Sequence, residues 1–128
     1  MAAGAANQFR DDDLTLNTAT DLSALQYHVV KISAEQTCAA ATADTDVPLG
    51  ILQNKPTSGE AARVRTAGKS KAVAGAAITV GDRLEVNASS RVITWATSGF
   101  VVGKALQAAA ANGETIEIVV GIGEETAP

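Results

Sequence analysis

The stretch LQNKPTSGE, from Leu52 to Glu60, returns 54 residues later as LQAAAANGE, from Leu106 to Glu114. In both copies an apolar segment with an internal glycine leads into Leu-Gln, and Gly-Glu leads into an alternating segment. Every residue in between becomes alanine or asparagine in the second copy, so the shared element is a backbone path and not a reactive group. We expect two hairpin-like units in which the glycine adopts a positive φ before the second strand.

The rest of the chain predicts short strands separated by turn sequences. Alternation is clearest near the C-terminus, where Ile116, Ile118, Val120 and Ile122 line one face. Closely spaced strands favour antiparallel pairing, because parallel strands need long crossovers that are usually helical. We therefore predict an all-β, mainly antiparallel fold, a small β-barrel or sandwich-like domain in which the two hairpins pack with pseudo-symmetry in one barrel. The expected strand segments are 25–33, 47–52, 61–68, 71–80, 82–86, 91–96, 100–106 and 115–122.

Two Ala-rich segments, 33–43 and 104–112, have helical propensity, so the prediction allows at most one or two short helices. Residues 1–22 are expected to form an extended N-terminal arm, because small and polar residues there offer little to anchor a core. Within it, residues 14–19 fit either a short edge strand or an extended segment. The predicted organisation is an arm (1–22), a β-rich domain (23–122) and a C-terminal tail (123–128).

The composition favours assembly over an isolated function. Hydrophobic residues make up 46% of the 128 residues, yet only four are aromatic, so the core is thin for this length. We expect it to gain from burial against a partner or against copies of itself. The net charge of −4 gives no general case for nucleic acid. No signal peptide and no apolar run of transmembrane length is present, so we expect neither secretion nor a membrane partner.

The charges are unevenly distributed along the chain. Residues 1–46 hold two basic and seven acidic side chains, residues 47–104 hold eight and three, and the last 24 hold none and four. In the basic middle part, Arg63 and Arg65 would share one strand face, as would Lys69 and Lys71. Two interpretations follow: these residues are solvated or paired within the protein, or they form a patch that meets an acidic protein surface.

The sequence offers no reaction centre. His28 and Cys38 are the only histidine and the only cysteine, so there is no disulfide and no CxxC motif. No glycine turn that could form an oxyanion hole adjoins Cys38, and the consecutive residues Asp11–Asp13 lack the spacing of a calcium loop. No glycine motif for phosphate is present. We predict no catalytic residue, no cofactor and no metal, and expect that the chain is not an enzyme.

One alternative links the chain to enzymes. The segment VAGAAITVGDRLEV, from Val73 to Val86, has the glycine turn and Gly-Asp seen in lipoyl- and biotinyl-carrier domains. Such domains carry a modified lysine at a hairpin tip, and the candidates here are Lys69 and Lys71. Neither has the flanking residues of that signature, and both lie on the other side of the glycine turn.

Three phrases in order resemble the small capsid decoration, or cement, proteins of tailed bacteriophages. They are VPLGILQNKPTSGEAARVRTAG (47–68), AVAGAAITVGDRLEV (72–86) and VVGKALQAAAANGETIEIVV (101–120). The resemblance implies a non-enzymatic virion protein, made in the host cytoplasm, that binds the outer surface of the mature head. Its partner would be the major capsid protein, whose lattice it stabilises, commonly as a homotrimer. The alternative is another β-structured assembly protein, such as a phage tail or baseplate component or an oligomeric adaptor.

The resemblance transfers no short site, so the contact residues are argued from their chemistry. Phe9 is a lone aromatic residue in a polar arm and is a natural anchor. Trp95 suits either a subunit interface or the core. The basic pair suits either acidic capsid loops or the acidic arm of a sister subunit. The predicted capsid or subunit contacts are Phe9, Arg10, Asp11, Asp12, Asp13, Arg63, Arg65 and Trp95.

Overall fold

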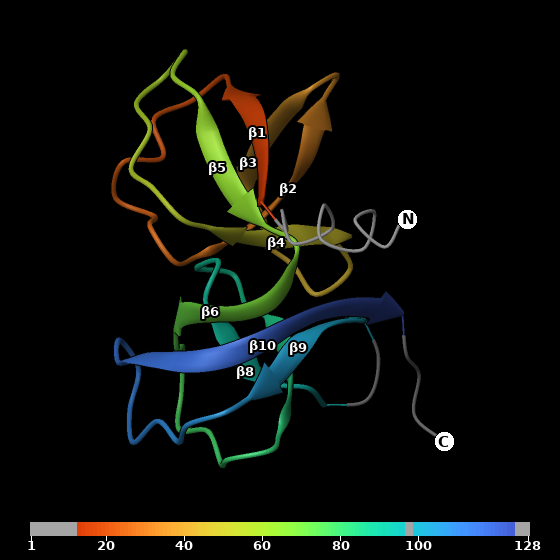
Figure 1. Ribbon diagram of the computed structural model, residues 1–128. Coiled ribbons are helices and arrows are strands. Elements are labelled where there is room, and N and C mark those ends of the chain that lie inside the picture. Colours follow the sequence, from red (N-terminus) through yellow and green to blue (C-terminus); the bar gives the residue numbers. More distant parts are fainter. Residues whose placement is uncertain (1–12, 97–98, 125–128) are drawn as a thin grey trace, which may run out of the picture.

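The computed structural model describes residues 13–96 and 99–124, and in this part of the chain no residue is helical. The fold is all-β and mainly antiparallel, as predicted (Figure 1). The strands are β1 (Asp13–Thr18), β2 (Val29–Ala34), β3 (Thr37–Ala40), β4 (Pro48–Leu52), β5 (Ala62–Arg65), β6 (Ala67–Val73), β7 (Arg83–Val86), β8 (Val92–Thr94), β9 (Phe100–Ala105) and β10 (Thr115–Glu124).

The strands form two layers that follow each other in the sequence. The first five close a barrel in the order β1-β3-β2-β4-β5, and the last five form a sheet in the order β6-β10-β9-β7-β8. Figure 1 shows the barrel stacked on the second sheet, with β4 at the junction. There β4 contacts β6, β9 and β10. The pairing of β1 with β3 is the one parallel pairing between the described strands.

The second sheet repeats the first in strand order. If β6 to β10 are matched to β1 to β5, the second sheet is the barrel opened between the counterparts of β1 and β3. The parallel pair Thr18–Cys38 closes this seam in the barrel, and the isolated parallel bridge Ala74–Val92 joins the same place in the second sheet. The chain is therefore a tandem pair of barrel-like units. We call β1 to β5 the first half and β6 to β10 the second half.

Backbone details confirm the repeat at a spacing of 54 residues. Gly59 N–H donates to the Thr18 carbonyl (3.0 Å), and Gly113 N–H donates to the Ala74 carbonyl (2.8 Å), which places each glycine at the equivalent seam. Both glycines have a positive φ, 86° and 96°, as the repeated phrase predicted. Three residue pairs 54 apart share a positive φ: Tyr27 and Gly81, Gln36 and Ser90, and Gly59 and Gly113.

The two predicted hairpins are present but lie in different sheets. β4 pairs with β5 in the barrel and β9 pairs with β10 in the second sheet, so the prediction that both lie in one barrel is wrong. In each loop the glutamate accepts a backbone N–H through Oε1: Glu60 from Thr57 (2.8 Å) and Glu114 from Ala110 (2.9 Å). The conserved Gly-Glu of the repeated phrase therefore fixes the shape of the loop.

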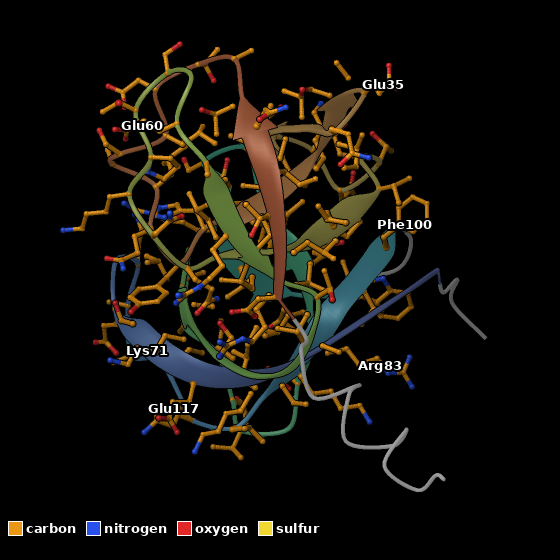
Figure 2. All side chains as sticks on the ribbon, turned by 45° about the horizontal axis from the view of Figure 1, so that its top comes forward. Glu35, Glu60, Lys71, Arg83, Phe100 and Glu117 are labelled. Atoms are coloured by element: carbon orange, nitrogen blue, oxygen red, sulfur yellow. The ribbon has the colours of Figure 1, made fainter. Side chains whose placement is uncertain are left out.

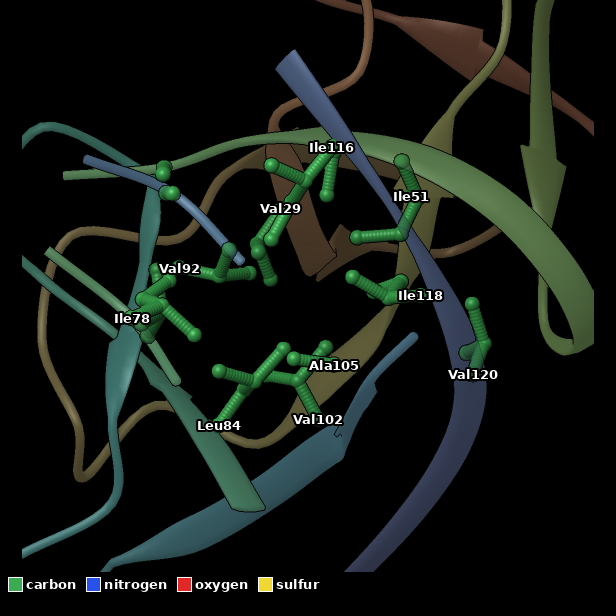
Figure 3. Close-up of a cluster of buried hydrophobic side chains, with 14 of the residues drawn as sticks. Val29, Ile51, Ile78, Leu84, Val92, Val102, Ala105, Ile116, Ile118 and Val120 are labelled. Atoms are coloured by element: carbon green, nitrogen blue, oxygen red, sulfur yellow. The ribbon is translucent and has the colours of Figure 1, made fainter. Parts of the chain in front are cut away.

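Each half has its own core, and a third group of side chains joins the two. Seven buried residues of the barrel have buried counterparts in the second half: Leu16, Leu22, Val30, Cys38, Leu52, Ala62 and Val64 match Ala72, Ile78, Leu84, Val92, Ala105, Ile116 and Ile118. Val29, Ala41 and Ile51 belong to the first half but pack in the second core, each with 0% exposure. Figure 3 shows Val29 beside Ile116 and Ile51 beside Ile118.

A piece of the first half completes the seam of the second. Val73 N–H, at the end of β6, donates to the Tyr27 carbonyl (3.1 Å), and Val29 N–H donates to the Ser90 carbonyl ahead of β8 (2.8 Å). Residues 27–29 thus lie between β6 and β8. The two halves therefore share backbone hydrogen bonds as well as a core.

The predicted arm does not hold from Asp13 onward. Residues 13–18 form β1 between β3 and β5, and Leu22 is 2% exposed in the barrel core. The alternation of Leu16 and Thr18, both buried, supplies the inward face of this short strand. At the other end β10 continues to Glu124, two residues into the predicted tail. Residues 1–12 lie outside the described residues.

Neither Ala-rich segment is helical. Segment 33–43 contains the end of β2, a tight turn at Gln36 (φ 53°) and β3. Segment 104–112 ends β9 and continues as a loop in which Ala109 exchanges two backbone hydrogen bonds with Ile78 (2.9 and 3.0 Å). Helical propensity is a weak preference, and here strand pairing overrides it. Two predicted strands are also shorter at one end, since β2 begins only at Val29 and β6 ends at Val73.

Candidate interaction surfaces

The two side chains with nucleophile or base chemistry have separate surroundings. Cys38 is fully buried in the barrel, and burial raises the pKa of its thiol. His28 Nδ1 lies 3.0 Å from the Gln26 carbonyl, and its Nε2 accepts a hydrogen bond from Arg91 Nε (3.4 Å). Among the described residues no cluster of His, Cys, Asp or Glu could hold a metal ion, and no helix is long and apolar enough to span a membrane.

The lysines of the carrier-domain alternative lie within a strand. Lys69 and Lys71 are both in the body of β6, away from any hairpin tip. Lys69 Nζ forms an ion pair with Glu117 Oε1 (3.0 Å), and Lys71 Nζ lies 5.8 Å from the centre of the Tyr27 ring. The exposed hairpin lysine that such a carrier requires is therefore absent at both candidate positions.

The basic pair Arg63 and Arg65 meets Asp13 of the same chain. Asp13 accepts two hydrogen bonds from Arg65, at Oδ1 from Nε (2.7 Å) and at Oδ2 from Nη2 (3.0 Å). Arg63 Nε lies 3.2 Å from Oδ2. These hydrogen bonds from Arg65 are the main cause that lowers the pKa of Asp13, and the positive charges of both arginines add to it. Of the two interpretations of this pair, pairing within the protein is the one present, although Arg63 keeps 56% of its side chain exposed.

We expect Asp13→Asn to lower the free energy of unfolding by about 1 kcal/mol at neutral pH, because a bidentate, partly buried pair between β1 and β5 is lost. The lowered pKa makes this contribution present above the unfolded-state value near 3.8 and lost as the pH falls through the folded-state value. Urea unfolding of both proteins from pH 7 into the acid range checks this. The control Asp21→Asn, in an exposed loop, should leave the midpoint nearly unchanged. A deficit of Asp13→Asn that persists undiminished in acid would contradict the role of the pair.

Trp95 lies beside two unsatisfied polar atoms in the second half. The Arg83 guanidinium lies 5.5 Å from the centre of the indole ring, and Trp95 N–H donates to the Arg83 carbonyl (2.7 Å). The indole Nε1 and Glu85 Oε1 are buried without a hydrogen-bond partner among the described residues. Burial raises the pKa of Glu85, and the nearby Asp44 raises it further. Trp95 is half-buried, so it belongs neither wholly to the core nor to the open surface.

Glu85→Gln is expected to stabilise the protein by about 1 kcal/mol at pH 7, because it removes a buried charge with an unsatisfied oxygen. The folded-state pKa lies above the unfolded value of 4.5, so the stability from this group is complete below about pH 4.5 and lost as the pH rises through the folded pKa. The gain should therefore vanish near pH 4. Thermal melts across this range test it, with the exposed Glu35→Gln as the control. A gain independent of pH would show that ionisation is not the cause.

Two hollows lie on the surface. The first, of about 500 Å³, separates the end of β2 from the start of β4 and is lined by residues 31–33 and 45–49. On it Ile32 and Val47 are 51% and 61% exposed, and Lys31 pairs with Asp46 (3.2 Å). The second, of about 290 Å³, lies on the second half and is lined by Arg83, Val101, Gly103, Lys104, Val119 and Gly121.

The structure places the predicted contact residues apart from one another. Asp13, Arg63 and Arg65 gather where β1 meets β5, and Trp95 lies in the second half. Phe9, Arg10, Asp11 and Asp12 lie outside the described residues. The sequence analysis missed Arg83 and Lys104, which meet as cross-strand partners of β7 and β9. Figure 2 shows Arg83, Lys71 and Glu117 projecting from the second half, and Glu35 and Glu60 from the first.

Comparison with known proteins places this geometry. The sequence profile of the phage cement protein family matches residues 8–121. Among solved structures, the fold is similar to the N base of head fiber gp8.5 in bacteriophage phi29, with a TM-score of 0.68 and 19% sequence identity. That match covers 85% of this chain and 92% of the other, and at this identity it shows the fold alone. Among curated proteins none matches the chain in sequence.

Proposed function

The chain belongs to the phage cement protein family, and from this membership we propose that it binds the outer surface of the mature phage head and stabilises the major capsid protein lattice. The family match over residues 8–121 carries the proposal, because it spans both halves of the fold. It confirms the resemblance that the ordered phrases of the sequence indicated. The proposed role is structural and not catalytic, in a protein made in the host cytoplasm.

The proposed mechanism is mass action. A protein that binds the assembled shell but not its separated subunits stabilises the shell by RT ln(1 + [L]/Kd) at each site. Two halves that share a core and backbone hydrogen bonds suit this role, because a firm module loses little conformational freedom on binding.

We further propose that the working unit is a homotrimer in which each chain contacts neighbouring capsid subunits. Large apolar side chains remain open on the surface of both halves, including Ile32, Val47 and Val80, which are 51–61% exposed. Such side chains favour burial against another surface. The predicted contacts in residues 9–12, together with Arg63 and Trp95, remain part of this proposal.

The test mixes purified protein with expanded shells that lack it. Saturable binding and a higher disruption temperature of the shells are expected, and no binding to any cognate shell contradicts the proposal. Sedimentation of the free protein and of the protein released from shells measures the trimer. A monomer in both states contradicts that part alone.

Deletion of residues 1–12 should weaken shell binding by about tenfold or more, because a lone aromatic anchor and three charged side chains are lost. The cut stops before Asp13, since Asp13 ties β1 to β5. The melting temperature should therefore stay nearly unchanged. Equal loss of binding and of folding stability would show that this segment belongs to the fold and is not a contact segment.

A further inference from the structure

The open face of the second half corresponds to the face by which the first half holds the second. Val29 and Ile51 are cross-strand partners of β2 and β4, and both are fully buried against the second half. Their counterparts in β7 and β9 are Arg83 and Lys104, which are cross-strand partners as well. The repeat has thus replaced an apolar contact surface by a cationic surface that faces outward.

The cations form a row across four strands. Lys69 of β6 pairs with Val119 of β10, Val119 pairs with Lys104 of β9, and Lys104 pairs with Arg83 of β7. Residues in one register row share a face of the sheet, so we call these four the cationic row. Val119 is 37% exposed, and Lys69 and Lys104 are exposed as well.

A shallow hollow accompanies the row. Its volume is about 290 Å³, and Arg83, Lys104 and Val119 line it together with Gly103 and Gly121. A Cβ at Gly121 would meet nothing within 4 Å, so the hollow is open at that side. The row therefore combines positive charge, an exposed apolar side chain and space for an entering side chain.

We infer that the cationic row is the docking surface for an acidic segment of a partner protein. Two of its cations already have neighbours, since Lys69 pairs with Glu117 and Arg83 lies over Trp95. Lys104 stands between them with no ion pair or hydrogen bond of its side chain within residues 13–96 and 99–124. On a chain of net charge −4, a local positive row orients the molecule toward negative surface.

The charge pattern favours a protein carboxylate over nucleic acid. The row spans three strand spacings, or about 14 Å. Nucleic acid binding usually shows a longer basic stripe with aromatic side chains on which bases stack. The one nearby aromatic ring, Trp95, already has Arg83 over it. A carboxylate beside Lys104, with an apolar neighbour on Val119, fits the row as it stands.

A second copy of the chain does not fit the row by repeating the internal contact. In the second half, the seam between β6 and β8 receives residues 27–29. The equivalent seam in the first half is closed by the pairing of β1 with β3, and Asn17 N–H donates to the Gln36 carbonyl there (2.8 Å). The partner is therefore a different protein. Its identity as the capsid protein rests on the proposed function.

The first test compares two lysine reversals that change the net charge equally. Lys104→Glu lies in the row, and the control Lys55→Glu lies in the exposed loop after β4 of the first half. Affinity for cognate expanded shells should fall about tenfold or more for Lys104→Glu and less than about twofold for Lys55→Glu. Melting temperatures of both variants should match the parent. Equal affinities of the two variants would overturn the inference and leave the proposed function intact.

The second test needs no capsid. Hexaglutamate is titrated into the labelled protein, and the amide NMR shifts of Lys104 and Val119 are followed. Saturable shifts in the parent and in Lys55→Glu, absent in Lys104→Glu, support the inference even if shell binding fails. No saturable shift in the parent overturns it. So does a single-stranded DNA 6-mer (a length matched to hexaglutamate) that binds the same amides more tightly, or a Lys104→Glu variant that only changes the sedimenting mass.

Discussion

Gly103→Ala is expected to lower the free energy of unfolding by about 3 kcal/mol or more, the upper range of overpacking. Gly103 lies in β9 opposite Val120 of β10, and a Cβ there would collide with the carbonyl oxygen of Val119. That oxygen belongs to the backbone of a paired strand, so it cannot rotate away as a side chain would. Relief requires β9 and β10 to separate at the centre of the second sheet. Urea unfolding followed by circular dichroism measures the loss.

The matched control is Gly121→Ala in the same sheet. A Cβ at Gly121 meets nothing within 4 Å, so the change should alter stability by less than about 0.5 kcal/mol. Gly50 provides a repeat of the test, because its Cβ would collide with the Arg65 carbonyl in the equivalent hairpin of the first half. Equal tolerance of alanine at Gly103 and Gly121 would refute the close approach of the two strands.

The repeated phrase predicted much of the fold, because it keeps the residues that determine backbone shape. Gly59 and Gly113 carry the positive φ and Glu60 and Glu114 hold the loops, so the hairpins were legible in the sequence. The wider repeat was not, since its other positions share geometry without sharing chemistry. Gly81 has the positive φ that Tyr27 has in the first half, and only glycine announces such a conformation in a sequence.

The strands that the sequence analysis did not define are those that depend on distant partners. β3 is a four-residue strand in an Ala-rich segment, and β1 is a short strand among polar residues. They pair in parallel at Thr18 and Cys38, and neither side chain signals a strand by periodicity. Local propensity therefore favoured a helix at one and an arm at the other, and tertiary pairing overrode both.

The candidate surface shows the same limit. The sequence analysis grouped Arg63, Arg65, Lys69 and Lys71 because they are close in the chain, yet Asp13 occupies the first two. Arg83 and Lys104 are 21 residues apart, and only the sheet order brings them together. Extending the 54-residue echo along the whole chain would have matched Val29 with Arg83. That match places an inner apolar residue against an outer cation.

Ile51→Lys is expected to cost about 4 kcal/mol or more, enough to unfold the chain at moderate temperature. Ile51 is fully buried where β4 packs on the second half, beside Ile118 (Figure 3). The substitution installs in the first half the residue that the second half carries at the equivalent position. An ammonium group there would lose its water without gaining a carboxylate, since the side chains around it are apolar.

The reverse swap, Lys104→Ile, supplies the control for this prediction. Lys104 is exposed on the outer face of β9, so isoleucine there should change the free energy of unfolding by less than about 0.5 kcal/mol. Chemical denaturation of both variants, followed by tryptophan fluorescence of Trp95 in the second half, measures the asymmetry. If the two swaps cost the same, the halves do not depend on the Val29–Ile51 contact. A large difference shows that equivalent positions of one repeated fold have taken opposite roles, one holding the halves together and the other facing outward.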